Sequence, residues 1–247
     1  MPSIYLSPST QEYNLYVNGG SEEQYMNQLA DALVPYLRAN GIRYTRNTPE
    51  MTAASSIAAS NAGQYHLHLA LHSNAAPEGQ EGKLQGSKAY YFPSSQKGRR
   101  AAQRFAANLK AIYPDPSKVE AVPTTSLGEV ALTRAPAVLL EIAYHDNPED
   151  ATWITEQIPE IARNLALSLT QYFGLPFQNP QPPREGTVIL SSGYLNIRDA
   201  PNTRSPVLAW AYNGAKLTVL GQVCDFYVVE FGDIIGFANA KYIAVSE

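Results

Sequence analysis

A proline-rich segment about two thirds of the way along the sequence most constrains how this chain can fold. Residues 174–183 read GLPFQNPQPP and hold four prolines in ten residues. Proline lacks a backbone N–H and fixes φ, so this segment cannot continue a helix and favours an extended, semi-rigid spacer. We therefore expect three parts: a domain over 1–173, a linker over 174–183 and a smaller domain over 184–247.

The first part alternates strand-like and helix-like segments. Apolar residues at helical spacing, with Ser21 as an N-cap, predict a first helix, and three later segments show helical patterns. The predicted helices are 22–39, 51–61, 96–112 and 148–173, and the predicted strands are 3–6, 42–45, 66–72, 88–92 and 137–143. Repeated β-then-α order predicts an α/β fold: a twisted, mostly parallel or mixed sheet flanked by helices on both faces.

The last part has no helical pattern. Short β-branched and aromatic runs alternate with Gly, Pro, Asn and Asp, which predicts a small all-β barrel. The candidate strands are 188–190, 194–198, 208–212, 216–223, 226–231 and 235–239. We expect its aromatic residues to fill part of the core that a small barrel needs: Tyr194, Trp210, Tyr212, Phe226, Tyr227, Phe237 and Tyr242.

Charge and composition exclude several classes of function. The net charge is −4 and no basic run exceeds Arg99-Arg100, so the stripe that neutralises nucleic-acid phosphates is missing. Cations are not clustered and no apolar stretch reaches spanning length, so we expect no membrane insertion. Cys224 is the single cysteine, so no intrachain disulfide can form. The first residues, MPSIYLSPST, show no signal-peptide pattern; either a leader has been removed or export follows a phage-type route.

Three polar residues stand where a carboxylate or imidazole has chemical value. Glu141 interrupts the apolar strand 137–143, where an unpaired carboxylate would be costly. His72 ends the apolar run 67–71, at the strand end where open α/β sheets place ligands. Glu23 lies in the first turn of its helix, where the helix dipole favours an anion. Each residue alone also has a purely structural interpretation, so their combination carries the argument.

That combination resembles the zinc-dependent N-acetylmuramoyl-L-alanine amidases of cell-wall hydrolases and endolysins. In these proteins a glutamate precedes an asparagine by four residues at the start of the first long helix, as Glu23 precedes Asn27. A strand ends in S-[IL]-H-x-N-A, which resembles Ala70-Leu-His-Ser-Asn-Ala75. A second glutamate follows a proline and precedes an asparagine, as in residues 135–147. The resemblance covers residues 3–173 in the same order and spacing.

The resemblance implies a role for each matching residue. Glu23 and His72 would bind Zn²⁺ and leave open coordination for water and a substrate carbonyl. Glu141 would act as general base on that water and then as general acid toward the departing amine. Asn74 would contact substrate. The bond cut would join N-acetylmuramic acid to the L-alanine of the stem peptide.

One departure from the family pattern concerns the metal. The family has a further histidine just after the first strand, whereas residues 6–14 (LSPSTQEYN) contain none. Either another residue serves as the third ligand or the affinity for zinc is reduced. The candidates for an extra ligand or active-site polar group are Glu22, Glu12, His68 and His145. His68 lies four strand residues from His72, about 13 Å along the strand, which is too far for one ion. His145 follows the strand of Glu141 and is better placed, although a local hydrogen bond explains it equally well.

The β-rich part resembles bacterial Src-homology-3-like domains. Tyr194-Leu-Asn-Ile-Arg198 followed by Ala200-Pro201 matches their L-N-[VI]-R-x-x-P signature, and the match extends over residues 186–245. Such barrels usually bind peptidoglycan peptides, which implies a wall-binding domain. A purely structural β-module is the alternative.

Together these patterns predict a monomeric hydrolase that acts at the cell wall on the glycan strand and stem peptide of peptidoglycan. One alternative is a catalytically weakened or inactive wall-binding protein, in which the absence of the family's histidine means that the metal is no longer bound. A zinc carboxypeptidase would require a glutamate three residues after a histidine, and none of the four histidines has one. A nucleotide-binding protein would require a Gly-rich turn after the first strand, where Ser7-Pro-Ser-Thr stands instead.

Overall fold

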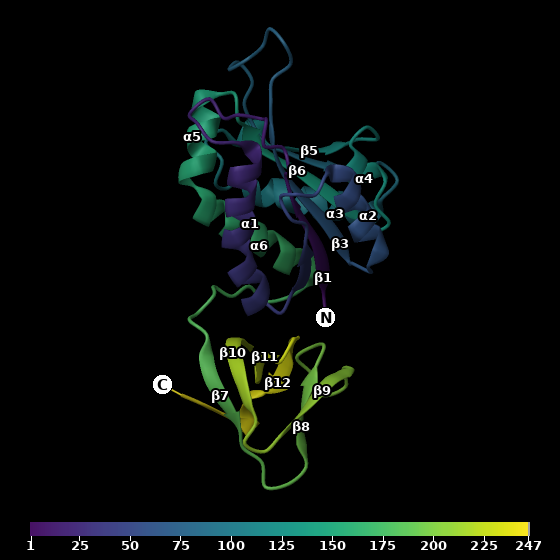
Figure 1. Ribbon diagram of the computed structural model, residues 1–247, viewed down its shortest axis with the longest axis vertical. Coiled ribbons are helices and arrows are strands. Elements are labelled where there is room, and N and C mark those ends of the chain that lie inside the picture. The colour runs from purple at the N-terminus through teal and green to yellow at the C-terminus, as the bar shows by residue number, and fades with distance from the viewer. Residues whose placement is uncertain (247) are drawn as a thin grey trace. The chain divides into compact units, whose positions relative to one another are not determined.

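The computed structural model describes residues 1–246 and contains two compact units, each with its own sheet (Figure 1). The first unit comprises Ser3–Val34 and Tyr44–Gly174; the second comprises the chain from Leu175 onward, together with Met1–Pro2 and Pro35–Arg43. Residues 175–183 form neither helix nor strand, which is consistent with a spacer. Glu247, the last residue of the predicted third part, lies outside the described residues.

The first unit is built on a six-stranded mixed sheet, as the sequence predicts. Its strands are β1 (Ser3–Pro8), β2 (Arg43–Arg46), β3 (Leu67–Asn74), β4 (Lys88–Tyr91), β5 (Glu120–Pro123) and β6 (Ala137–Tyr144), in the order β2-β1-β3-β6-β4-β5. Strands β1, β3 and β6 are parallel neighbours, whereas β4 runs antiparallel to β6. The carboxyl ends of β1, β3 and β6 therefore meet at one edge of the sheet.

Helices flank this sheet. They are α1 (Glu22–Ala39), α2 (Ala53–Ala62), α3 (Gln96–Leu109), α4 (Gly128–Ala131), α5 (Pro148–Glu156) and α6 (Ile158–Phe173), with a short 3-10 turn at Pro116–Lys118. Figure 1 shows α2 beside α4 on one side of the sheet and α1, α5 and α6 on the other, and α3 packs along α6. Within residues 1–246, no helix has the length and apolar character needed to cross a membrane.

The helix predicted over 148–173 is divided in two at Gln157. Pro159 explains the break, because its ring removes a backbone donor and clashes with the preceding turn, so it can only stand in the first turn of a new helix. The helix predicted from residue 51 begins at Ala53, since Thr52 caps it with its side chain. Neither β5 nor the short helix α4 was predicted, because both are four residues long and show no clear period.

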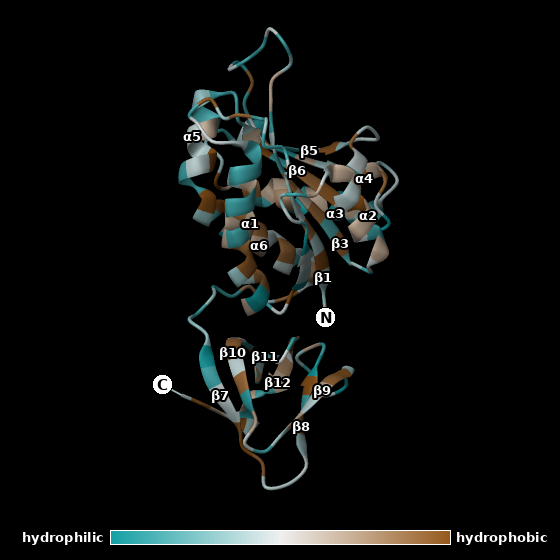
Figure 2. Cartoon of the chain, in the orientation of Figure 1, coloured by the Kyte–Doolittle hydropathy of each residue, from teal (hydrophilic) through white to brown (hydrophobic). Residues whose placement is uncertain are grey.

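The central strands are buried along almost their whole length. Every residue of β1 is buried, and β3 and β6 each have one residue outside the buried class, Asn74 and Glu141 respectively. Figure 2 shows this band of apolar residues running through the sheet. Polar side chains at the ends of these strands therefore stand out against an apolar background, and they form the candidate site described below.

The second unit is an antiparallel seven-stranded sheet consistent with a Src-homology-3-like barrel. Its strands are β7 (Arg184–Val188), β8 (Tyr194–Arg198), β9 (Val207–Tyr212), β10 (Lys216–Val223), β11 (Phe226–Phe231), β12 (Ile234–Asn239) and β13 (Ile243–Val245), with a 3-10 turn at Ala240–Tyr242 before the last strand. The first strand of this unit was predicted over residues 188–190, whereas β7 begins at Arg184 and ends at Val188. Strand β13 was not among the six predicted strands.

Only part of the predicted aromatic set enters the core of this unit. The core consists mainly of aliphatic side chains such as Val188, Ile197 and Val229, and only Phe226 and Phe237 of the aromatic set are buried. Tyr194, Trp210 and Tyr212 are instead 53%, 58% and 69% exposed. The strand period explains this, because alternate residues of β8 and β9 face opposite sides of the sheet, and these three face outward.

We predict that a chain ending at Gly174 folds without the barrel. Helix α6 ends at Gly174, whose φ of 71° suits glycine, and all six strands of the first sheet precede it. A single cooperative thermal transition, with a circular dichroism spectrum of mixed helix and strand, is expected. An insoluble or molten product would show instead that the barrel is required for this fold.

Candidate active site

The candidate site lies at the carboxyl ends of β3 and β6. These parallel strands pair so that His72 lies directly opposite Glu141. Because side chains alternate along a strand, residues that pair across neighbouring strands point to the same face. The sheet thus places the imidazole and the carboxylate of two predicted site residues side by side.

His72 is held between two buried carboxylates. Its Nδ1 lies 2.8 Å from Oε1 of Glu22, in the first turn of α1, and its Nε2 lies 2.8 Å from Oε2 of Glu129, in α4. The relative exposures of these residues are 9%, 1% and 5%. Burial alone would lower the pKa of His72, but the hydrogen bonds and charges of Glu129 and Glu22 raise it well above its ordinary value. The two carboxylates therefore favour the charged form of His72.

Glu129 is a member of this cluster that the sequence did not predict. Besides His72, its carboxylate accepts a hydrogen bond of 2.5 Å from the Ser7 hydroxyl of β1 and lies 3.2 Å from Nε2 of His68. Burial would raise the pKa of Glu129, but the hydrogen bonds from His68 and His72 outweigh it and hold the pKa at about 2. Glu129 stays ionised across the physiological range.

His68 and His72 are thus bridged by one carboxylate. The predicted separation of about 13 Å describes backbone positions along β3, whereas side chains four residues apart share one face of the strand. His68 also contacts the Ser60 hydroxyl through Nδ1, at 3.0 Å. Both of its ring nitrogens therefore have protein partners, and His68 helps to hold the Glu129 carboxylate in place.

The environment of Glu141 shifts its pKa in the opposite direction from that of Glu129. Its Oε2 atom is buried and is among the polar atoms of residues 1–246 that have no hydrogen-bond partner. Burial, reinforced by the negative charge of Glu22 and only partly opposed by His72, raises the pKa of Glu141 to about 7. A carboxylate with a free oxygen and a pKa near neutrality can both take up and release a proton at physiological pH.

Glu22, rather than Glu23, is the acid of α1 that contacts His72. Successive helical residues point about 100° apart around the axis, so only one of the two adjacent glutamates can face the site. Glu22 is almost fully buried and also accepts a hydrogen bond of 2.6 Å from Asn14 Nδ2. Asn27, the partner of Glu23 in the sequence motif, instead donates to the backbone oxygens of Glu23 and Ser9 and so fixes the turn before the helix.

His145 and Asn74 lie next to the site without joining the Glu22–His72–Glu129 contacts. His145 is buried, places Nδ1 3.0 Å from the Ser73 hydroxyl, and stacks on Tyr16. These contacts match the interpretation of His145 as a residue that makes local hydrogen bonds. Asn74 uses its side-chain oxygen to accept a hydrogen bond from the N–H of Ala75, and its carbonyl accepts one from the N–H of His145. Glu12 is exposed.

The donor set fits a divalent cation only in part. Glu22 Oε1 and His72 Nδ1 are close enough to share one ion, and Glu129 on Nε2 would orient the imidazole as an outer carboxylate. Across residues 1–246, however, no group of three or more His, Cys, Asp or Glu side chains is arranged to hold a metal. Two ligands are therefore in place and a third of these types is missing.

A family comparison agrees with this arrangement. The model of one protein family, described as N-acetylmuramoyl-L-alanine amidase, matches residues 10–171. The chain belongs to the N-acetylmuramoyl-L-alanine amidase family. A second model, the bacterial SH3 domain, matches residues 193–244 and accounts for the barrel. This membership supports hydrolysis of a muramoyl amide in peptidoglycan as the activity of the first unit.

Solved structures of amidases share the fold of this unit. AmiC2 of Nostoc punctiforme aligns with a TM-score of 0.60 at 12% identity, covering 70% of this chain and 97% of that one. CwlD of Clostridioides difficile, solved with the GerS lipoprotein, gives 0.62 at 13% identity over 70% and 99% of the two chains. The catalytic domain of the CD27L endolysin, which targets Clostridium difficile, gives 0.57 at 21% identity over 69% and 98%. A search of curated proteins finds no significant match.

We predict that Glu129→Gln destabilises the metal-free protein by about 2–4 kcal/mol at pH 7, because it leaves two histidines without their anionic partner. Since the pKa of Glu129 is lowered to about 2, its stabilising effect is present above its ordinary pKa and is lost as the pH falls toward 2. The difference in free energy of unfolding between the variant and the wild type, measured with a denaturant, should therefore become smaller as the pH falls from about 4.5 to 2. Exposed Glu156→Gln serves as the control; an equal loss in both variants contradicts the role of Glu129.

Proposed function

We propose that this protein hydrolyses the amide bond between the lactyl group of N-acetylmuramic acid and the L-alanine of the stem peptide. The observation that carries this proposal is Glu141: a carboxyl group with an unpartnered oxygen and a pKa near 7, paired across the strands with His72. Acyl transfer to water needs a group that removes a proton at one step and returns it at the next, and this environment suits both tasks.

In the proposed reaction, Glu141 accepts a proton from the attacking water as the new C–O bond forms. It then gives that proton to the departing amine as the C–N bond breaks, so that one amide and one water yield one acid and one amine. Glu22 and His72 would hold Zn²⁺, in place of the expected pair Glu23 and His72, with Glu129 fixing the orientation of the imidazole. When bound, that ion would polarise the substrate carbonyl and acidify water.

The glycan strand and stem peptide of peptidoglycan would be the partner of both units, and the enzyme would act as a monomer at the cell wall. The alternative, a wall-binding protein with weakened or absent catalysis, keeps the same partner. It differs in one respect: it gives no reason for a buried, unpartnered oxygen on Glu141 beside His72. Such an atom is costly unless it serves a purpose.

We predict that Glu141→Gln lowers the release of new N-terminal alanine from purified peptidoglycan by about 10²- to 10⁴-fold. The same substitution should not reduce stability. Because burial raises the pKa of Glu141 to about 7, this carboxyl group ionises in the unfolded chain but not in the folded protein as the pH rises from about 4.5 to 7. That difference lowers the free energy of unfolding of the wild type, and glutamine, which does not ionise, avoids it. The variant should therefore gain stability relative to wild type over that range. Near-wild-type hydrolysis by Glu141→Gln would remove this residue from the reaction.

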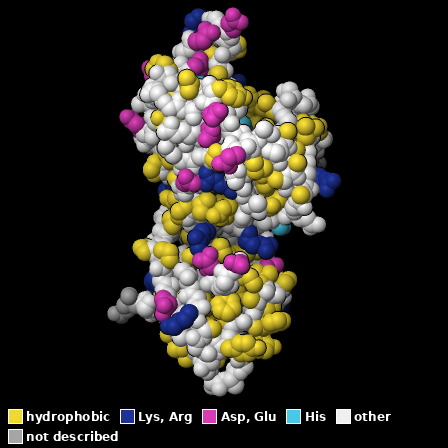
Figure 3. Space-filling model, in the orientation of Figure 1, with side chains coloured by type: hydrophobic (Ala, Val, Ile, Leu, Met, Phe, Trp, Pro, Cys, Tyr) yellow, Lys and Arg dark blue, Asp and Glu magenta, His cyan; other side chains and the backbone are white. Residues whose placement is uncertain are grey.

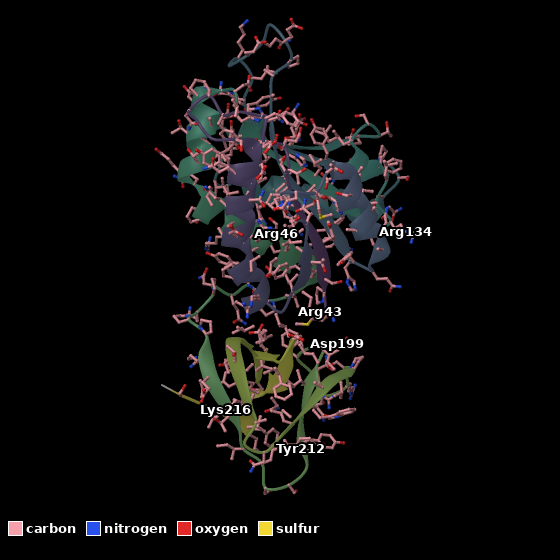
Figure 4. All side chains as sticks on the ribbon, viewed as in Figure 1. Arg43, Arg46, Arg134, Asp199, Tyr212 and Lys216 are labelled. Atoms are coloured by element: carbon pink, nitrogen blue, oxygen red, sulfur yellow. The ribbon has the colours of Figure 1, made fainter. Side chains whose placement is uncertain are left out.

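The outward face of the β8–β9 hairpin is the surface that supports wall binding. Tyr194 pairs across the strands with Tyr212, and Asn196 pairs with Trp210. The rings of Trp210 and Tyr212 contact Tyr194 edge-on, with centroids 6.0 Å and 6.5 Å away. Figure 3 shows hydrophobic side chains gathered over these strands, and Figure 4 labels Tyr212 among them. Exposed aromatic groups of this kind commonly mark a binding surface.

We predict that Trp210→Ala in the full-length chain reduces co-sedimentation with purified cell walls, while hydrolysis of soluble muropeptides is unchanged. Fusing a binding module to an enzyme can raise its effective concentration at a polymer by about 10². Hydrolysis of intact walls should therefore fall with binding. Val207→Ala, a partly exposed position on the same strand outside the aromatic cluster, is the control. Unchanged sedimentation of the Trp210 variant would argue against this face.

A further inference from the structure

Strand β8 presents aromatic and polar side chains on the outer face of the barrel. Tyr194, Asn196 and Arg198 alternate along the strand with two residues that are buried in the core. Since alternate residues of a strand point to the same side of the sheet, these three share one face. The pairing of β8 with β9 places the exposed rings of β9 on that face as well.

A groove of about 670 Å³ lies against this face. Its volume falls in the range of about 300–1,000 Å³ that is typical of ligand sites. Tyr194 lines the groove and also contacts the rings of Trp210 and Tyr212, so the groove is continuous with this aromatic cluster (Tyr194, Trp210 and Tyr212). Besides the three residues of β8, the lining includes segment 189–192, Thr203, Phe226, Asn239 and Tyr242.

The hydrogen-bonding groups of this groove are almost all neutral. The side-chain amide of Asn196 and the hydroxyls of Ser191, Ser192 and Thr203 form no hydrogen bond with another residue of the described chain, 1–246. Among the described residues that line the groove, none is acidic and Arg198 alone is basic. The groove therefore suits a ligand with many neutral donors and acceptors.

Arg198 adds a single positive charge to the groove. Its Nη1 atom donates to the backbone carbonyl of Ser205 at 2.8 Å, which fixes the position of the side chain. Its guanidinium forms no ion pair with any residue that the structure describes. A guanidinium has five N–H donors in a planar fork that matches the geometry of a carboxylate, and one hydrogen bond leaves most of them available. The groove thus also suits a carboxylate.

We propose that the groove and the aromatic cluster bind the glycan strand of peptidoglycan at a muramic acid whose stem peptide has been removed. The sugar rings would lie on the aromatic cluster, and their hydroxyl and acetamido groups would hydrogen-bond to the neutral side chains of the groove. The free carboxylate of the lactyl group would pair with Arg198. This inference rests on the proposed function, because hydrolysis of the muramoyl amide is the reaction that frees this carboxylate.

The charge of the groove favours the glycan over the stem peptide, which is the ligand that the resemblance implies. A stem peptide that is not cross-linked presents the amino group of a diamino acid, and an ammonium group removed from water requires an anionic partner. The described lining of the groove offers none. A sugar ring, by contrast, has an apolar face of C–H groups that can pack on an aromatic ring.

This ligand has a consequence for how the enzyme works on a wall. The product that hydrolysis leaves on the strand would become the anchor of the barrel. The protein would then accumulate where hydrolysis has begun, and the local concentration of the first unit would rise beside amide bonds that are still intact.

The test uses the full-length chain and peptide-free glycan strands prepared with a different amidase of established activity. These strands contain no bond that the proposed activity cuts. The readout is tryptophan emission, and Trp210→Phe, which keeps an aromatic ring, identifies the part of the signal that comes from Trp210 rather than from Trp153. The strands should change the Trp210 emission, and Arg198→Gln should weaken their binding by about 10-fold. Arg204→Gln, at an exposed arginine of the neighbouring loop, is the matched control and should bind as the wild type does.

A change in the ligand keeps the test decisive even where Arg198→Gln perturbs the barrel. Strands whose lactyl carboxylates have been converted to amides should bind the wild type about 10-fold more weakly than unmodified strands. An unchanged Trp210 emission, equal affinity for both kinds of strand, or a Trp210 response to free stem peptide instead of glycan would overturn the inference. Failure of the proposed function is a separate result: binding of the strands as expected, with no release of alanine from peptidoglycan.

Discussion

The bracketing of His72 by Glu22 and Glu129 is the interaction on which the rest of the site depends. The two carboxylates come from residues 50 and 57 positions away in the sequence, and all three groups are almost out of contact with water. Three buried ionisable groups are costly unless each charge has partners with good geometry. Here Ser7, Asn14 and His68 supply the remaining hydrogen bonds, which ties β1, α1 and α4 to the end of β3.

Two carboxylic acids near His72 have very different pKa values. Glu129, surrounded by donors, has a pKa of about 2, whereas Glu141, buried without a partner for one oxygen, has a pKa of about 7. The same functional group therefore ionises far below neutral pH in one position and near neutral pH in the other. Environments that drive two pKa values apart in this way are typical of acid–base catalysts.

The two units differ in where they place their aromatic and apolar residues. The first unit buries its long aliphatic strands, and a few polar groups lie at their ends. The barrel fills its interior with valine, leucine and isoleucine, which leaves Tyr194, Trp210 and Tyr212 free on the outer face of β8 and β9. The first unit thus carries its polar cluster at the ends of buried strands, and the second carries exposed aromatic rings on one face.

The sequence by itself determined the class of both units, the strand positions of His72 and Glu141, and the start of the first long helix. These features follow from local periods and caps, which depend on residues close together in the chain. It placed the acid that contacts His72 at Glu23, whereas Glu22 makes this contact. Adjacent helical residues differ in direction by about 100°, and the sequence does not show which of them faces the sheet. Glu129 could not be found at all from local patterns. It contacts His72 across 57 residues of chain, and such contacts are set by the order of the strands in the folded sheet.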